Sequence, residues 1–140
     1  MKIKFKKLDP QAQIPSYAHK GDAGLDLKTI ETKTIHPGTR QQFRTGLSFE
    51  LQEGYVFLIK DKSGLAVNHG ITTLAGVIEY TYRGEIIVIL HNLSDKPKTF
   101  EKGDKVAQAL IMPITTVEIE ETETLSQTQR GEKGFGSTGR

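Results

Sequence analysis

Apolar and polar residues alternate in short runs along most of this chain, and Gly, Pro, Asn or Asp separates one run from the next. The runs are KIKFK, GLDLKT, TIHPG, GLSFELQEGYVFLI, GEIIVILHNLSDK and KGDKVAQALIMPI. A period of two is typical of half-buried β-strands, and β-branched residues, which are frequent in these runs, favour strands too. The spacing of the runs predicts an all-β sandwich or barrel.

Two segments depart from this alternation. SGLAVNH predicts one or two turns of helix, with Ser63 as its N-cap. RGEKGFGSTGR, at the end of the chain, holds four glycines and one apolar residue, Phe135. Such a segment cannot build a core, because glycine loses the most backbone entropy on ordering and little apolar area offsets that loss. We therefore expect an all-β core over residues 1–124 and an arm over 125–140, which is either a loose tail or orders over another surface.

Composition excludes several classes of protein. A chain of 140 residues is expected to form one domain, and its formal net charge of +2 is far from the basic surface of a general nucleic-acid binder. Cysteine is absent, which excludes disulfides, thiolate nucleophiles and Cys-type zinc sites. The four histidines are scattered, so any metal should be a hard ion held by oxygens. The apolar stretches are too short for a membrane span and the N-terminus does not resemble a signal peptide, so we expect a cytoplasmic protein.

Two stretches in the first half carry chemistry beyond structural need. In GDAGLDL, Asp26 lies in a glycine-lined strand start, where an ordinary turn residue is the alternative. In KDKSGLA, Ser63 and Gly64 open the helix with free backbone N–H groups, and Lys62 places a cation beside them. Together these groups are typical of an anion site, although an ordinary capped helix has the same pattern.

Two further stretches lie in the second half. GVIEYTYRGEI is a turn between apolar strands that carries Glu79, Tyr82 and Arg83, where a simple hairpin is the alternative. The C-terminal segment combines glycines with Arg130, Phe135 and a Ser-Thr pair. Arg and hydroxyl groups bind phosphate oxygens and Phe stacks on flat rings, so this segment has the composition of a lid over a nucleotide as well as that of a disordered tail.

Read in order, AGLDL, KSGLA, GVIEYTYRGE, GDKVAQALI and RGEKGFGSTG resemble the five motifs of the homotrimeric dUTPase family, and the resemblance covers nearly the whole chain. It implies an antiparallel β jelly roll, or distorted barrel, that assembles as a homotrimer with sites at the subunit interfaces. It also implies hydrolysis of dUTP to dUMP and pyrophosphate with Mg²⁺, which keeps uracil out of DNA and supplies dUMP for thymidylate synthesis. The arm would close over the site of a neighbouring subunit.

The resemblance also implies roles for single residues. Glu79 would be the carboxylate that activates water for attack on the α-phosphorus, and Asp26 would help to hold magnesium through its water shell. Arg83 would brace the hairpin. The residues that would contact substrate, from the phosphates to uracil and deoxyribose, are Lys62, Ser63, Gly64, Gly76, Val77, Ile78, Tyr82, Gln108, Arg130, Phe135, Gly136, Ser137 and Thr138.

Four positions depart from the family's usual pattern. Glu79 stands where Asp is usual, Lys62 where many members have Arg, and Leu74 and Lys133 where Gly is common. Glu is one methylene longer than Asp, and a misplacement of about 1 Å can cost roughly a hundredfold in rate. Two alternatives therefore remain: a nucleotide-binding or regulatory module with weak catalysis, and a deaminase of the dCTP type, which shares the fold.

Overall fold

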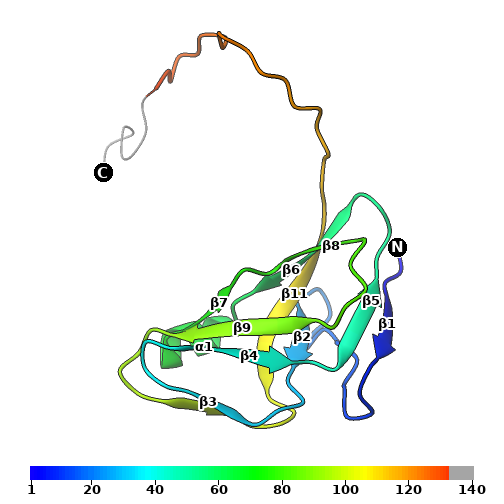
Figure 1. The fold of residues 1–140 in the computed structure, drawn as a ribbon, viewed down its shortest axis with the longest axis vertical. Helices are drawn as coiled ribbons and strands as arrows, with labels where there is room; N and C mark the ends of the chain where they lie inside the picture. Colours follow the sequence, from blue (N-terminus) through cyan, green and yellow to red (C-terminus); the bar gives the residue numbers. More distant parts are fainter. Residues whose placement is uncertain (133–140) are drawn as a thin grey trace.

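Short antiparallel strands make up most of the molecule in this computed structural model, which describes residues 1–132 (Figure 1). The elements are β1 (Lys4–Lys7), β2 (Leu25–Lys28), β3 (Lys33–Ile35), β4 (Arg40–Arg44), β5 (Leu47–Glu50), β6 (Tyr55–Lys60), α1 (Ser63–His69), β7 (Ile71–Leu74), β8 (Val77–Glu79), β9 (Ile87–Asn92), β10 (Lys98–Phe100) and β11 (Lys105–Pro113). The all-β prediction is confirmed, and α1 covers the predicted helix.

The strands form four small antiparallel sheets within the described part of the chain. The largest has the order β2-β11-β6-β8, and a three-stranded sheet has the order β4-β9-β7. Two further pairs, β1-β5 and β10-β3, extend the structure at its ends. Because β6 lies between β11 and β8, it connects the motif segment on β11 with the hairpin segment on β8.

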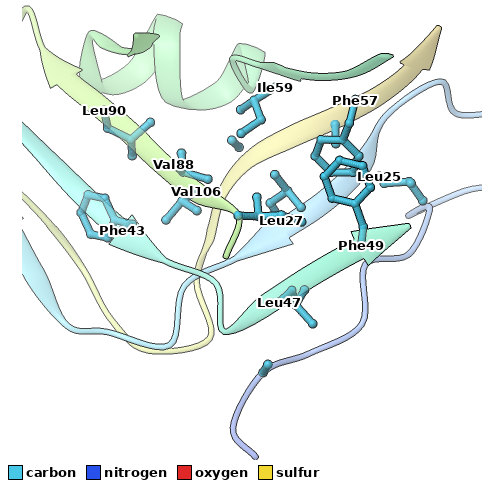
Figure 2. Close-up of a cluster of buried hydrophobic side chains, with 14 of the residues drawn as sticks. Leu25, Leu27, Phe43, Leu47, Phe49, Phe57, Ile59, Val88, Leu90 and Val106 are labelled. Carbon is cyan, nitrogen blue, oxygen red and sulfur yellow. The ribbon is translucent and has the colours of Figure 1, made fainter. Parts of the chain in front are cut away.

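The hydrophobic core lies between the sheets and explains the alternation seen in the sequence. Along β9, successive residues alternate between half-buried and buried positions, as expected for a strand with one face against the core. Figure 2 shows the side chains that meet in the interior. Phe49 stacks on Phe57 with ring centroids 4.6 Å apart, and Phe43 meets Phe100 edge-on at 5.3 Å. Each of these contacts joins two sheets, and all four sheets contribute buried side chains to one core.

The start of α1 differs in one respect from the prediction. Ser63 was expected to be the N-cap, but Lys62 holds that position with extended backbone angles (φ −92°, ψ 125°) and no side-chain cap bond. The carbonyl of Lys62 accepts hydrogen bonds from the N–H groups of Leu65 and Ala66. Ser63 is already the first helical residue, so its hydroxyl is not used as a cap.

The last strand ends at Pro113, and residues 114–132 contain no helix or strand. This segment leads away from the sheets in Figure 1. The predicted boundary between core and arm at residue 125 therefore falls inside a stretch of irregular backbone, and it stays a prediction. No helix among residues 1–132 is long and apolar enough to cross a membrane.

Candidate functional site

Asp26 lies at the centre of a charged cluster formed by β2, β11 and the residue before α1. One carboxylate oxygen pairs with the ammonium of Lys62, and the other lies 2.6 Å from that of Lys105. The Asp26 side chain is 8% exposed, whereas those of Lys62 and Lys105 are 26% and 46% exposed. The cluster therefore holds one buried negative charge and presents two positive charges toward solvent.

The surroundings of Asp26 keep it ionised. Burial acts to raise its pKa, but the hydrogen bonds and charges of Lys105 and Lys62 outweigh burial, so the pKa lies below its ordinary value of 3.8. The ionised Asp26 holds the ammonium groups of the two lysines in place. The cluster of the three residues has a net charge of +1. Such an arrangement suits the binding of a second, larger anion such as a polyphosphate.

The start of α1 adds backbone donors next to this cluster. Ser63 and Gly64 are exposed, and the first N–H groups of a helix have no partner inside the helix. Lys62, Ser63 and Gly64 thus bring a cation, a hydroxyl and N–H groups to one exposed turn. Lys62 meets Asp26 through a single oxygen, as expected for an ammonium and unlike the two-pronged contact that arginine makes.

Gln108 lies on β11 directly opposite Asp26 of β2 and Lys60 of β6. Its amide nitrogen donates to the carbonyl of Asp61 at 2.7 Å. Gly24 makes room for this side chain, because a Cβ at Gly24 would lie 2.2 Å from the Gln108 amide oxygen. The structure therefore places Gln108 opposite Asp26, the residue that pairs with Lys62, and its contact with phosphate stays a prediction.

The hairpin residues gather around a separate groove of about 230 Å³. The predicted hairpin residues that line it are Gly76, Val77, Ile78, Glu79 and Tyr82. Small-molecule sites usually measure about 300–1,000 Å³, so this groove suits one ring better than a whole nucleotide. Its walls are predominantly apolar, with Glu79 and Glu85 as the carboxylates at its edge.

Tyr82 folds back over the turn that connects β8 with β9. Its hydroxyl donates to the carbonyl of Glu85 at 3.1 Å, and a Cβ at Gly84 would lie 2.2 Å from the hydroxyl oxygen. Arg83 donates to the carbonyls of Tyr80 and Tyr82 at 2.6 and 2.8 Å, which is the bracing role expected for it. Tyr82 itself remains 42% exposed and accessible to a ligand.

Glycine is common in the family at the position of Leu74, but the positive φ of this turn falls one residue later. Ala75, with φ 61°, is the one non-glycine residue with positive φ in the described chain, so the side chain at Leu74 is not strained. Gly76 follows with φ 111°, and a Cβ there would lie 2.8 Å from the carbonyl oxygen of Ile59. The tight approach to β6 explains the glycine. The other position where Gly is common, Lys133, lies outside the described residues.

The structure does not bring Glu79 together with the charged cluster inside one chain. Glu79 pairs with Val56 at one end of β6, whereas Gln108 pairs with Lys60 at the other. The two positions are about 13 Å apart along the strand at the usual rise of β-structure. Glu79 is exposed, and no hydrogen bond or ion pair of its carboxylate is recorded within residues 1–132.

The arm residues stay predictions. Phe135, Gly136, Ser137 and Thr138 lie outside the described residues. Arg130 is described and lies in a bend without regular secondary structure.

Lys105 is the residue of this cluster that the sequence interpretation missed. It is the basic residue of GDKVAQALI, and a signal was present in the motif itself. The motif suggested a role for Gln108 only, and Lys105, three residues before it, was given none. Only the pairing of β11 with β2 shows that its ammonium reaches Asp26.

The described residues do not form a direct magnesium site. Both carboxylate oxygens of Asp26 are already paired with lysines, and no group of three or more His, Asp or Glu side chains suited to a metal ion occurs in residues 1–132. Mg²⁺ prefers six oxygens and often keeps water while it binds substrate phosphates. Asp26 as a magnesium residue therefore stays a prediction, and the geometry limits it to contact through water.

Comparison with known proteins agrees with the motif assignments. The family model for dUTPase matches residues 10–139. The chain is 49% identical to the deoxyuridine 5'-triphosphate nucleotidohydrolase of Nautilia profundicola over the full length of both, and 50% identical to that of Trichodesmium erythraeum over 99% of both. The fold is similar to that of the Staphylococcus bacteriophage 80alpha dUTPase solved with dUPNHPP, with a TM-score of 0.93, 29% identity and 99% of each chain covered. The resemblance inferred from the five motifs is confirmed, and the chain belongs to the dUTPase family.

Proposed function

We propose that this chain hydrolyses dUTP to dUMP and pyrophosphate. Family membership supports this activity, since relatives at about half identity over the whole length are named for it. The observation that carries the proposal is the convergence of three motif segments. Asp26, Lys62 and Gln108 come from distant parts of the chain and meet beside the exposed turn that opens α1, which is rich in donors.

The phosphates of dUTP would bind at this turn. Lys62 supplies charge, Ser63 and Gly64 supply N–H groups, and Lys105 adds a second ammonium. Fixed positive charge of this kind lowers the barrier to phosphoryl transfer because it stabilises the negative charge that builds on the leaving pyrophosphate. The groove behind Gly76 and Val77 would hold uracil, with Tyr82 against the deoxyribose.

Glu79 would act as the base that orients and deprotonates the attacking water. Its carboxylate is exposed and borders the groove, so it is free to contact a water beside a bound nucleotide. The water oxygen forms a bond to the α-phosphorus, the bond from that phosphorus to the bridging oxygen breaks, and Glu79 takes the proton. Water, dUTP and the products balance without a further reactant.

A homotrimer with shared sites explains why Glu79 and the charged cluster lie at opposite ends of β6. If one subunit supplies the phosphate turn and a second supplies the hairpin, the groups meet without any change inside a chain. The segment after Pro113 supports an exchange between copies, because Val117, Ile119 and Leu125 are 68%, 91% and 86% exposed in the single chain. Apolar side chains at such exposure favour burial against another surface. The arm over residues 125–140, with Arg130, Phe135, Ser137 and Thr138, would close on the nucleotide.

Magnesium would arrive with the triphosphate, because the described chain offers no inner set of ligands for it. In that role it would neutralise part of the phosphate charge. A direct test is turnover with and without a chelator. Loss of activity in the chelator, restored by added Mg²⁺, is expected.

Product analysis by ion-exchange chromatography tests the proposal. Pure protein with Mg²⁺ is incubated separately with dUTP, dCTP, dTTP and UTP, and conversion of dUTP alone to dUMP is expected. Binding of dUTP without turnover in the parent, together with turnover in Glu79→Asp, would instead identify a nucleotide-binding module whose catalysis Glu79 has weakened. Release of ammonia from dCTP would identify the deaminase alternative.

A further inference from the structure

Asp61, between β6 and α1, makes contacts that none of the roles above explains. Its carboxylate accepts hydrogen bonds from the backbone N–H of Thr73 at 2.6 Å, from the Thr73 hydroxyl, and from the Thr72 hydroxyl at 3.0 Å. Its own carbonyl accepts from the Gln108 amide at 2.7 Å. One residue thus joins the phosphate turn, β7 and β11.

The contact with Thr73 closes a gap between two sheets. β7 is the last strand of its sheet and pairs with β9 on one side only, so the Thr73 N–H on its other edge has no strand partner among the described residues. The Asp61 carboxylate takes the place of that missing strand. Close by, the N–H of Ile59 donates to the carbonyl of Gly76 at 2.8 Å. The end of β6 is therefore tied to residues 73–76 at two points.

The electrostatic surroundings favour the ionised, accepting form of Asp61. Burial acts to raise its pKa, but the Thr73 and Thr72 hydrogen bonds and the charge of Lys60 outweigh burial, so the pKa lies below 3.8. A carboxylate that accepts three hydrogen bonds cannot rotate freely. Its backbone, which leads directly into Lys62, is fixed with it.

We propose that Asp61 is a positioning residue for the dUTPase reaction: it fixes the phosphate turn at Lys62–Gly64 relative to the hairpin that begins at Leu74, without contacting substrate. This inference rests on the proposed function, because both segments are placed at the substrate there. In a trimer with shared sites the two segments of one chain serve neighbouring sites. The contacts of Asp61 then fix the positions of these two segments relative to each other within one subunit.

A purely structural role would predict lower stability and normal kinetics in the folded enzyme. A positioning role predicts a kinetic defect well below the unfolding temperature, because displacement of reacting groups by about 1 Å can cost roughly a hundredfold. We expect Asp61→Ala to lower kcat/KM for dUTP by about tenfold to a hundredfold. Asp61→Asn keeps one oxygen to accept from the Thr73 N–H, so it should recover a large part of that loss.

The experiment measures kcat and KM of the full chain at 25 °C for the parent, Asp61→Ala, Asp61→Asn and Asp95→Ala, with thermal unfolding and circular dichroism on each. Asp95 is the matched control, since it is exposed and no contact of its side chain is recorded in residues 1–132. Asp95→Ala should match the parent. A folded Asp61→Ala with kcat/KM within twofold of the parent would overturn the positioning role and leave the proposed function intact. A parent without dUTP turnover would instead overturn the proposed function, and the inference with it.

Discussion

The charged cluster around Asp26 and the hairpin around Glu79 are built in opposite ways. At Asp26 every charge has a partner inside the chain, and a buried carboxylate holds two lysines in place. At Glu79 the carboxylate is exposed beside an apolar groove, and residues 1–132 supply no hydrogen-bond or ion-pair partner for it. The first region is complete before substrate arrives. In the proposed mechanism, the second gains its partners only when another surface, from substrate or from a second copy, covers it.

The largest expected effect tests the hairpin. Glu79→Gln removes the base but keeps the size of the side chain, and general base catalysis is typically worth about 10²–10⁴ in rate. We expect turnover of dUTP to fall by that factor, measured as dUMP by ion-exchange chromatography. The melting temperature should not change, because Glu79 is exposed. Glu101→Gln, also exposed, serves as the control. A Gln variant with parental turnover would exclude Glu79 as the base.

The second prediction tests the cluster. Asp26→Ala leaves two ammonium groups facing each other without their shared anion, and loss of one partner from a buried pair is strongly destabilising. The lysines still reach solvent, so we expect a loss of about 2–3 kcal/mol in the free energy of unfolding, measured with urea.

A surface ion pair of the same length is the control for this substitution. Lys4 and Glu50 are 2.6 Å apart, but their side chains are 75% and 53% exposed. Exposed pairs contribute little, so Glu50→Ala should leave unfolding unchanged. Equal effects of the two substitutions would show that the burial of Asp26 is unimportant.

The sequence predicted the all-β fold and most of the cluster because those features depend on local pattern and on motif order. Alternation fixes which side chains of β9 face the core, and AGLDL, KSGLA and GDKVAQALI each mark one piece of the site. Lys105 and Asp61 were missed because their roles arise from pairing between strands that are distant in sequence. Motif comparison marked Leu74 as unusual but did not locate the positive φ at Ala75, because motif order carries no information about dihedral angles.

The pH dependence of stability provides a third prediction. The pKa values of Asp26, Glu31 and Asp61 all lie below their ordinary values in the folded protein. In acid, the unfolded protein therefore binds more protons than the folded protein. These groups contribute their full stability above the unfolded-state values, and the contribution is lost as the pH falls through the lower folded-state values. The contribution of these three carboxylates to the melting temperature should be nearly constant from about pH 7 to 5. Below about pH 4 it should decrease, and the melting temperature should fall. Asp26→Asn should make the acid slope shallower, whereas an unchanged slope would contradict the assignment.

The smallest effect concerns the backbone of the turn between β7 and β8, which contains positive φ angles at Ala75 and Gly76. Ala75 has φ 61°, and this left-handed conformation costs a residue with a side chain about 1–2 kcal/mol. Glycine would remove that cost, but its larger conformational entropy in the unfolded state would offset part of the gain. We expect Ala75→Gly to stabilise the protein by less than about 1 kcal/mol in urea unfolding.

Two glycine substitutions separate strain from contact, one at Gly76 in this turn and one at Gly54 in the turn between β5 and β6. Gly54 has φ 83° and no atom within 4 Å of an added Cβ, so Gly54→Ala should show the cost of strain alone. At Gly76 the added Cβ would also lie 2.8 Å from the Ile59 carbonyl, so Gly76→Ala should destabilise more than Gly54→Ala. If the two substitutions cost the same, the hairpin does not press against β6. The glycine at position 76 would then be explained by its positive φ alone, and the β6–β8 pairing, the Ile59–Gly76 hydrogen bond and the Asp61 contacts would hold the hairpin in place.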